Sequence, residues 1–179
     1  MSYNIPSPYT LLSSKSASSS TTISFTSGIS TNFLVYYVKL RNIVCSASGG
    51  PTIQLVFSTN GGSSYLNSGY SYAYKISASG GFNSGTNGTA VSQINVVDNI
   101  NNSSSTGTNV NLYLYNLTDS SRQKNVFYNG VVFDDTDSSL VLDYGGGCNT
   151  GTTAVNAIQF SMSSGNFTSG SFDLYGVTE

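Results

Sequence analysis

The chain has 179 residues, of which 38% are hydrophobic and only 8% charged, and its formal net charge is −2 at pH 7. This length fits one large β-sandwich domain, and the few basic residues form no cluster, which argues against a nucleic-acid-binding protein. The absence of histidine excludes Ser-His-Asp and Cys-His nucleophilic chemistry and removes the commonest metal ligand.

The first eight residues predict an extended arm, because Pro6 and Pro8 remove backbone donors and favour an extended path. We expect residues 1–8 to form this arm and residues 9–179 to form a β-sandwich domain. The first residues lack the basic and apolar regions of a secretory signal, and no apolar run approaches the ~18 residues of a membrane span. These features predict a protein that is made in a cytoplasm and has no membrane span.

The first half of the chain shows the period of two that is typical of strands. Strands are predicted at Thr21–Phe25, Phe33–Val44, Thr52–Ser58 and Tyr70–Ile76. The nearly continuous apolar run Phe33–Val38 predicts a central strand that is covered on both faces. The serine-rich segment Ser13–Ser20 is typical of a connection, and Asn60–Gly61 is a hairpin signal.

The second half continues the same alternation of strands and turn signals, without any stretch of helical period. Strands are predicted at Val91–Val97, Val110–Leu117, Lys124–Phe133 and Ser139–Tyr144. Three Gly-, Ser- and Asn-rich segments predict long loops, at Ser77–Thr89, Asp98–Thr108 and Gly145–Thr153.

The segment Ala154–Val177 holds two further strands, with turn residues between them that indicate either a hairpin or a corner between two sheets. Together, about ten short strands predict an all-β fold: a two-sheet antiparallel, jelly-roll-like sandwich in a single domain. The predicted core includes Phe25, Val35, Leu40, Leu55, Phe57, Leu114, Ile158, Phe160, Phe172 and Leu174.

The two cysteines leave a disulfide open, but Cys45 ends an apolar strand and is more typical of a buried thiol. Acidic residues cluster at Asp134, Asp135 and Asp137, where a solvated loop is favoured over a calcium site and over catalysis. These three residues are a weak candidate for a metal site. No motif for a cofactor is present, and we expect the protein not to be an enzyme.

Tyrosines at period two give the sequence its second candidate site. Tyr70, Tyr72 and Tyr74, with Phe82 in the following loop, are predicted to contact either a protein interface or a glycan. Packing on a sheet or in an oligomer interface is favoured over glycan binding, because tryptophan, the best residue for stacking on sugars, is absent.

Three segments in a fixed order span nearly the whole chain: Leu11–Ser14 with Thr22–Ile29, then Phe57–Tyr65, then Ala157–Asn166 with Ser169–Val177. In this order and spacing they resemble the small jelly-roll virion proteins of tailed bacteriophages, especially marine ones. The third segment is the most specific, and none of the three is catalytic. The resemblance supplies no established site residues.

The resemblance implies a non-enzymatic protein on the virion surface, either a capsid decoration, cement or knob protein or, as the alternative, a tail-fibre or tail-tip module that binds a host receptor glycan. It implies a homotrimer whose partners are its own copies and other virion proteins. The short arm favours a freestanding decoration or knob protein over a whole fibre. The three loops hold few aromatic or charged anchors, which favours the structural role.

Overall fold

The computed structural model of the protein describes residues 7–79, 81, 83–134 and 139–178, and these form two antiparallel sheets. The large sheet has the strand order β1 (Tyr9–Ser20), β12 (Phe167–Val177), β3 (Val35–Cys45), β8 (Thr108–Tyr115), β9 (Lys124–Phe133), β10 (Leu140–Asn149), β5 (Tyr70–Ala78) and β6 (Asn83–Val91). The small sheet has the order β2 (Thr22–Phe25), β11 (Ala157–Met162), β4 (Ile53–Ser58) and β7 (Ile94–Val97). The described residues contain no helix, so the predicted all-β antiparallel sandwich is confirmed.

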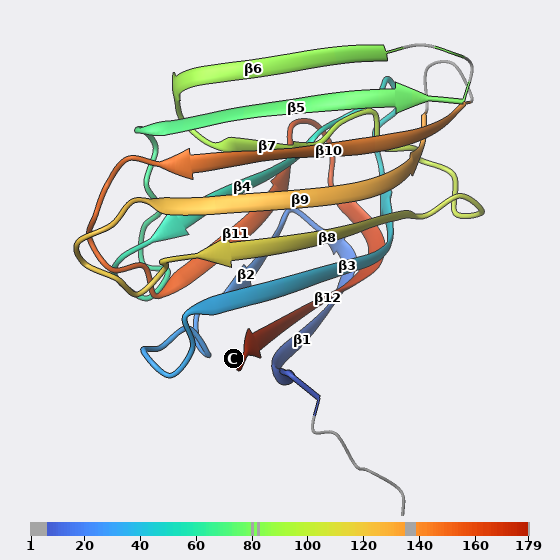
Figure 1. Ribbon diagram of the computed structural model, residues 1–179. Helices are drawn as coiled ribbons and strands as arrows, with labels where there is room; N and C mark the ends of the chain where they lie inside the picture. The colour runs from blue at the N-terminus through green and yellow to red at the C-terminus, as the bar shows by residue number, and fades with distance from the viewer. Residues whose placement is uncertain (1–6, 80, 82, 135–138, 179) are drawn as a thin grey trace, which may run out of the picture.

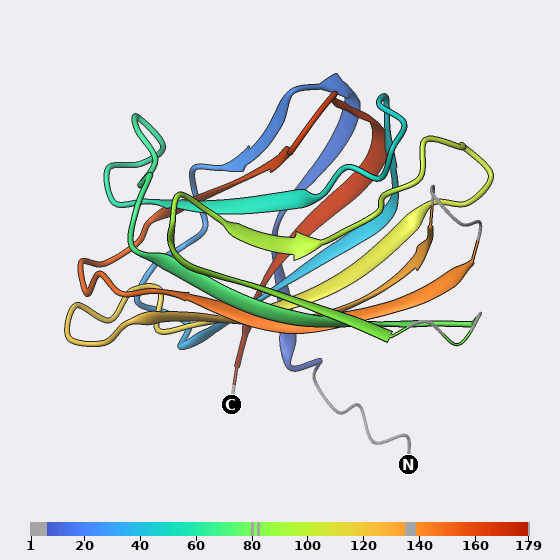
Figure 2. The same ribbon diagram turned by 90° about the horizontal axis from the view of Figure 1, so that it is seen from above.

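The two sheets form two layers, with the large sheet in front and the small sheet behind it (Figure 1). Seen from above, the large sheet curves around the small one (Figure 2). Strands that are neighbours in a sheet are often distant in sequence, as for β1 with β12 and β3 with β8. The chain therefore passes repeatedly between the layers, as in a jelly roll.

The core lies between the layers and is built from the inward side chains of both sheets. Phe160 of β11 and Phe172 of β12 join the sheets directly, with ring centroids 5.8 Å apart. The predicted core residues are buried except Val35, which is half-buried and points away from the small sheet. The prediction for Val35 is wrong because a continuous apolar run does not reveal which face is inward; its neighbour Tyr36 fills the core instead.

The connection between β11 and β12 is a corner rather than a hairpin, because β11 belongs to the small sheet and β12 to the large one. Gly165 adopts a φ of 70° in this corner, a conformation that favours glycine. Two reciprocal pairs of hydrogen bonds hold the corner. The Ser163 amide donates to the Thr52 carbonyl and the Thr52 amide to Ser163 Oγ, both at 2.9 Å. The Asn166 amide donates to Ser46 Oγ and the Ser46 amide to the Asn166 carbonyl, both at 2.9 Å.

Three strands depart from the predicted elements. The serine-rich segment Ser13–Ser20 belongs to the edge strand β1, and much of the predicted loop Ser77–Thr89 forms the opposite edge strand β6. Strand β10 continues through Gly145–Asn149, which was predicted as a loop. Glycine is needed there: a Cβ at Gly145 would lie 2.5 Å from the Ala73 carbonyl oxygen of the neighbouring strand.

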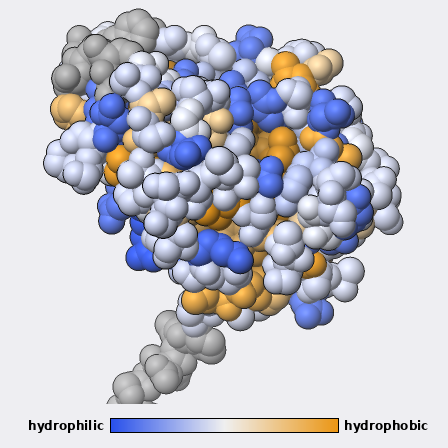
Figure 3. All heavy atoms as spheres, turned by 180° about the vertical axis from the view of Figure 1, so that it is seen from behind, coloured by the Kyte–Doolittle hydropathy of each residue, from blue (hydrophilic) through white to orange (hydrophobic). Residues whose placement is uncertain are grey.

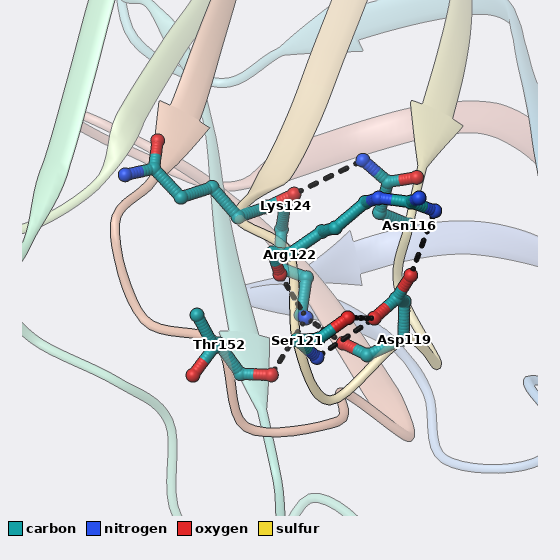
Figure 4. A network of polar contacts seen from close by, with 7 residues as sticks. Asn116, Asp119, Ser121, Arg122, Lys124 and Thr152 are labelled. Atoms are coloured by element: carbon teal, nitrogen blue, oxygen red, sulfur yellow. Dashed lines mark hydrogen bonds and ion pairs between the residues drawn. The ribbon is translucent and has the colours of Figure 1, made fainter.

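A buried lysine closes the loop between β8 and β9 (Figure 4). The Lys124 ammonium donates to the carbonyls of Asp119, Arg122 and Thr152. The Asp119 carboxylate in the same loop accepts from Ser121 and from Arg122. Because the Lys124 side chain is fully buried, the three carbonyls replace the water that its charge would otherwise bind.

The predicted N-terminal arm lies mostly outside the described residues, which begin at Ser7. Pro8 lies beside the other end of the described chain, because the Thr178 amide donates to the Pro8 carbonyl at 2.9 Å. The pairing of β1 with β12 continues from this point (Figure 1). Among the described residues, none form a helix with the length and apolar character needed to cross a membrane.

Candidate functional site

The outer face of the large sheet, which points away from the small sheet, carries most of the exposed large hydrophobic side chains. Residues alternate between the two faces of each strand, so the strand register decides which side chains become neighbours on this face. The exposed residues on it are Tyr9, Leu11, Tyr115, Phe127, Val131, Phe133, Leu140, Leu142 and Tyr144. Exposed apolar residues gathered in this way mark interaction surfaces.

Four aromatic residues from neighbouring strands form one row across the outer face. Tyr175 of β12 lies opposite Tyr37 of β3, which lies opposite Tyr113 of β8. Tyr113 in turn lies opposite Phe127 of β9. Leu11 of β1 pairs with Tyr175 and brings the row to the edge of the sheet. We call Tyr175, Tyr37, Tyr113 and Phe127 the aromatic row.

Tyr37 is the centre of a tyrosine cluster. Its ring centroid lies 5.1 Å from that of Tyr113, 5.2 Å from that of Tyr9 and 5.7 Å from that of Tyr175. The hydroxyls of Tyr9 and Tyr113 are 3.3 Å apart, and this hydrogen bond, together with burial, raises the pKa of Tyr113 to about 12. Burial, with the nearby Tyr9 and Tyr175, raises the pKa of Tyr37. Both phenols therefore keep their protons at neutral pH.

A second row lies two residues further along the same strands and is polar. It pairs, in order across the sheet, Lys39, Asn111, Asn129, Tyr144 and Lys75, which we call the polar row. The Tyr37 hydroxyl donates to Asn111 Oδ1, and Asn111 Nδ2 donates to Asn129 Oδ1 at 3.3 Å. This chain of hydrogen bonds connects the two rows across β3, β8 and β9.

Two shallow hollows lie along these rows. One has a volume of about 380 Å³ and is lined by Ser7, Tyr9, Tyr37, Lys39, Tyr113 and Tyr175. The other, of about 510 Å³, is lined by residues that include Asn109, Asn111, Phe127, Asn129, Val131, Leu142 and Tyr144. Asn111 of the polar row borders the second hollow, and its hydrogen-bond partner Tyr37 borders the first.

Two apolar cross-strand pairs lie beside the second hollow. Leu142 of β10 is opposite Val131 of β9, and Leu140 is opposite Phe133. These four side chains are between 37% and 51% exposed. We call them the apolar strip.

The charge of the outer face is positive although that of the chain is negative. The carboxylate of Asp173 accepts from Arg41 at 2.7 Å and from Ser14 at 2.5 Å. Asp173 is therefore neutralised within the face. No carboxylate of the described residues lies within ion-pair distance of Lys39 or Lys75. Lys75 stands at one end of the polar row, and Lys39 at the other end lies opposite Asp173 of β12, whose carboxylate pairs with Arg41 instead.

The tyrosines that the sequence singled out lie elsewhere. Tyr70 and Tyr74 are buried between the sheets, so the predicted ligand or interface contact is corrected for these two residues. In the core, the Tyr70 hydroxyl instead accepts a hydrogen bond from the Phe57 amide at 2.8 Å. Tyr72 is half-buried and stacks on Tyr74 at 6.0 Å. Phe82 lies outside the described residues.

The predicted acidic loop also turns inward where it is described. Asp134 is buried, and its Oδ2 accepts from Asn99 Nδ2 at 2.7 Å, so the prediction of a solvated carboxylate is wrong for this residue. Asp135 and Asp137 lie outside the described residues. Within the part of the chain that the structure describes, no three Cys, Asp or Glu side chains lie close enough to hold a metal ion.

A pair of carboxylates that the sequence did not indicate lies under the outer face. The Tyr74 hydroxyl donates to Asp98 Oδ2 at 2.8 Å, and the Asp98 amide donates to Asp143 Oδ2 at 3.1 Å. Asp143 Oδ1 is buried and has no hydrogen-bond partner among the described residues. Burial, opposed by the bond from the Asp98 amide, raises the pKa of Asp143 to about 7. Asp143 is buried and Asp98 is half-buried.

The opposite side of the molecule shows a different surface. Over the small sheet most residues are polar, and apolar residues appear in recesses and at the lower edge (Figure 3). No local sequence pattern indicates the rows on the large sheet, because Tyr37, Tyr113 and Tyr175 become neighbours only through strand order. Comparisons with family models, curated proteins and solved structures give no match to the chain.

Proposed function

We propose that this protein is a non-enzymatic structural protein that works as a homo-oligomer on the surface of a larger particle. The resemblance to small jelly-roll virion proteins of tailed bacteriophages leads us to propose that this particle is a phage virion. A capsid decoration, cement or knob position follows from the same resemblance, as does a homotrimer.

The observation that carries this proposal is the apolar strip. Four apolar side chains in two cross-strand pairs are half-exposed, and their neighbours on the face, Asn109 and Ser77, are uncharged. Exposed apolar groups without charges between them are typical of the centre of an interface that becomes dry on assembly.

The place of the apolar strip suits such an interface. The strip lies where β9 ends and β10 begins, and its Val131 is four residues, roughly 14 Å, along β9 from Phe127 of the aromatic row. A partner centred on the strip leaves the aromatic row uncovered. A copy of the same chain is the partner that we favour, because a chain with 8% charged residues repels its copies only weakly.

The non-enzymatic part of the proposal is supported by the chemistry of the side chains. The chain has no histidine, and in the Asp98–Asp143 pair Asp143 is buried while both carboxylates accept hydrogen bonds, from the Tyr74 hydroxyl and from the Asp98 amide. A hydrolase would need an acid and a base that face a substrate.

Sedimentation velocity on the purified chain at micromolar concentration tests the assembly. We expect a trimer for the wild type and a monomer for Leu142→Glu, which places a charge in the apolar strip. Gln159→Glu, on the outer face of the small sheet, is the matched control and should remain trimeric. A wild-type monomer that also fails to join purified virions, by immunogold labelling, would contradict the proposal.

A further inference from the structure

The aromatic row and the polar row run parallel across β3, β8 and β9. Each step along either row is one strand spacing, ~4.8 Å, and the two rows are two residues apart along the strands, ~7 Å. A ligand that lies across β3, β8 and β9 therefore meets an aromatic ring of each strand on one side and, on the other, the Lys39 ammonium followed by the amides of Asn111 and Asn129.

The rings and amides are already held in place. Tyr37 packs against the rings of Tyr9, Tyr113 and Tyr175, so little side-chain freedom is lost when a ligand covers it. Its hydroxyl orients the Asn111 amide, which in turn donates to Asn129. The Asn129 amide nitrogen makes no hydrogen bond that the described residues provide, and it faces the hollow of about 510 Å³. The site is preorganised before any ligand binds.

The charge of this surface selects among ligands. Lys39 lines the hollow of about 380 Å³ together with four tyrosines, and no described carboxylate pairs with it. Lys75 stands at the far end of the polar row, four strand spacings or roughly 19 Å away. An extended ligand with acidic groups satisfies both ammonium ions, whereas a compact neutral one satisfies neither.

We propose that the aromatic row and the polar row together bind an acidic saccharide chain that lies across the strands of the large sheet. The C–H face of a sugar ring stacks on the negatively polarised face of a tyrosine or phenylalanine ring. Sugar hydroxyls exchange hydrogen bonds with the amides of Asn111 and Asn129, and an acidic substituent pairs with Lys39. The inference goes beyond the proposed assembly role and does not depend on it.

The regularity of the surface favours a saccharide over other polymers. A repeating chain matches rings that recur on four neighbouring strands and amides on two of them, whereas protein interfaces depend on a few Trp, Tyr or Arg anchors in deep pockets. A single-stranded nucleic acid would also stack on aromatic rings, but it requires a groove with many basic residues along its backbone. Within the described part of the chain, this face offers two ammonium ions that pair with no carboxylate.

A glycan panel tests the proposal with the full chain. The panel holds oligogalacturonate, oligomannuronate, sialylated and phosphorylated oligosaccharides, each beside its neutral counterpart, and a single-stranded oligonucleotide. We expect binding to at least one acidic glycan, at least about tenfold weaker binding to its neutral counterpart, and weaker binding as salt concentration rises.

Variants then locate the site. We expect Lys39→Gln to weaken binding to the acidic glycan about tenfold and to remove the preference over the neutral counterpart, since only the charge is lost. Tyr37→Ala should weaken binding to both glycans about tenfold or more. Lys15→Ala and Tyr65→Ala, which remove the same groups outside the two rows, are the matched controls and should bind as the wild type does.

The possible results distinguish a saccharide site from its absence. Circular dichroism confirms that each variant is folded, and Lys39→Gln keeps the test valid if Tyr37→Ala fails to fold. Absence of binding to every acidic glycan overturns the proposal, as does equal binding of the neutral counterparts or preference for the oligonucleotide. Sedimentation of the same samples reports assembly independently, so a failure here is distinct from a failure of the proposed oligomer.

Discussion

The two sheets of the sandwich distribute polar and apolar side chains in opposite ways. The small sheet has polar residues on its outer face and a fully apolar inner face; the outward residues include Ser24, Gln54, Asn95, Gln159 and Ser161. The large sheet carries tyrosine, phenylalanine and leucine outward, while its buried residues include Thr108, Lys124, Asp143 and Asn149. The small sheet follows the alternation expected of a sheet with one solvated face. The large sheet departs from this alternation on both of its faces.

This difference is the reason that we propose the large sheet as the functional one. The polar outer face of the small sheet is stable in contact with water and needs no partner to cover it. An apolar outer face above buried polar groups lowers the stability of an isolated chain, and such local departures from the folding rules are concentrated at functional sites. Each experiment below tests a consequence of this difference between the two sheets.

The largest expected effect is a pH dependence that originates under the large sheet. The pKa of Asp143 is about 7 in the folded protein, raised mainly by burial from an ordinary 3.8. Between these values the folded chain holds a proton that the unfolded chain has released. The bound proton raises the free energy of unfolding by at most about 4 kcal/mol. This stabilisation is complete below pH ~4 and is lost as the pH rises through 7. Urea denaturation of the wild type from pH 4 to pH 8 should show this fall, and Asp143→Asn should remove it.

Asp119 is the control for this measurement. Hydrogen bonds from Ser121 lower the pKa of Asp119, which lies at the surface. Its contribution therefore has the opposite sign: it is present at neutral pH and is lost on acidification. Asp119→Asn should leave the loss of stability between pH 5 and 8 intact. An Asp143→Asn variant with the wild-type slope would contradict our account of the buried pair.

The next effect concerns the glycine run of β10. Gly145→Ala brings a methyl group to 2.5 Å from the Ala73 carbonyl oxygen and from Tyr74 Cβ, so the backbone of β5 or β10 must shift. We expect a loss of about 3 kcal/mol in the free energy of unfolding, measured by urea denaturation. Gly85→Ala on the edge strand β6 is the control: its nearest contact would be 3.4 Å, and the change should stay below about 1 kcal/mol.

A smaller effect follows from the buried ammonium. Lys124→Met keeps the length of the side chain but removes three charge-assisted hydrogen bonds to carbonyls. Relief from desolvation of the charge offsets part of this loss, and we expect a net destabilisation of about 2 kcal/mol in thermal unfolding. Lys75→Met on the exposed outer face should change the stability by less than about 0.5 kcal/mol. Equal effects for the two lysines would show that the carbonyls do not hold the loop.

The smallest effect is expected on the stability of the outer face itself. Leu142→Ser removes a side chain that is 51% exposed, so at concentrations that keep the chain monomeric it should change the free energy of unfolding by only about 0.5 kcal/mol. Differential scanning fluorimetry in dilute protein measures this. A loss above about 2 kcal/mol would place Leu142 in the core rather than in an interface.

Strands rich in β-branched and aromatic residues could be predicted from the sequence, and edge strands could not. Lys124–Phe133 matches β9 from end to end, because it is rich in valine, phenylalanine and tyrosine, which favour strands. The Ser-rich half of β1 and the whole of β6 lack this signal. They are strands because their backbones pair with β12 and β5, a cause that leaves little trace in side-chain composition.

The candidate site was the harder part to predict. Period two shows that Tyr70 and Tyr74 share a face, but it does not say whether that face is the core or the surface. The aromatic row depends on the register of β12, β3, β8 and β9. No local pattern indicates that Tyr37 and Tyr175 meet.

Because β12 lies between β1 and β3, the large sheet can be completed only after β12 has been synthesised. Ser14 and Asp173 are hydrogen-bonded although they are 159 positions apart in the chain. β12 leaves the ribosome after every other described strand. β1 therefore has no partner in the large sheet until almost the entire domain has been translated. Such non-local pairing slows folding and leaves an unpaired strand exposed to other chains. Residues Ser13–Ser20 of β1 are rich in serine. A polar strand of this kind has a low tendency to pair with other chains before β12 is synthesised.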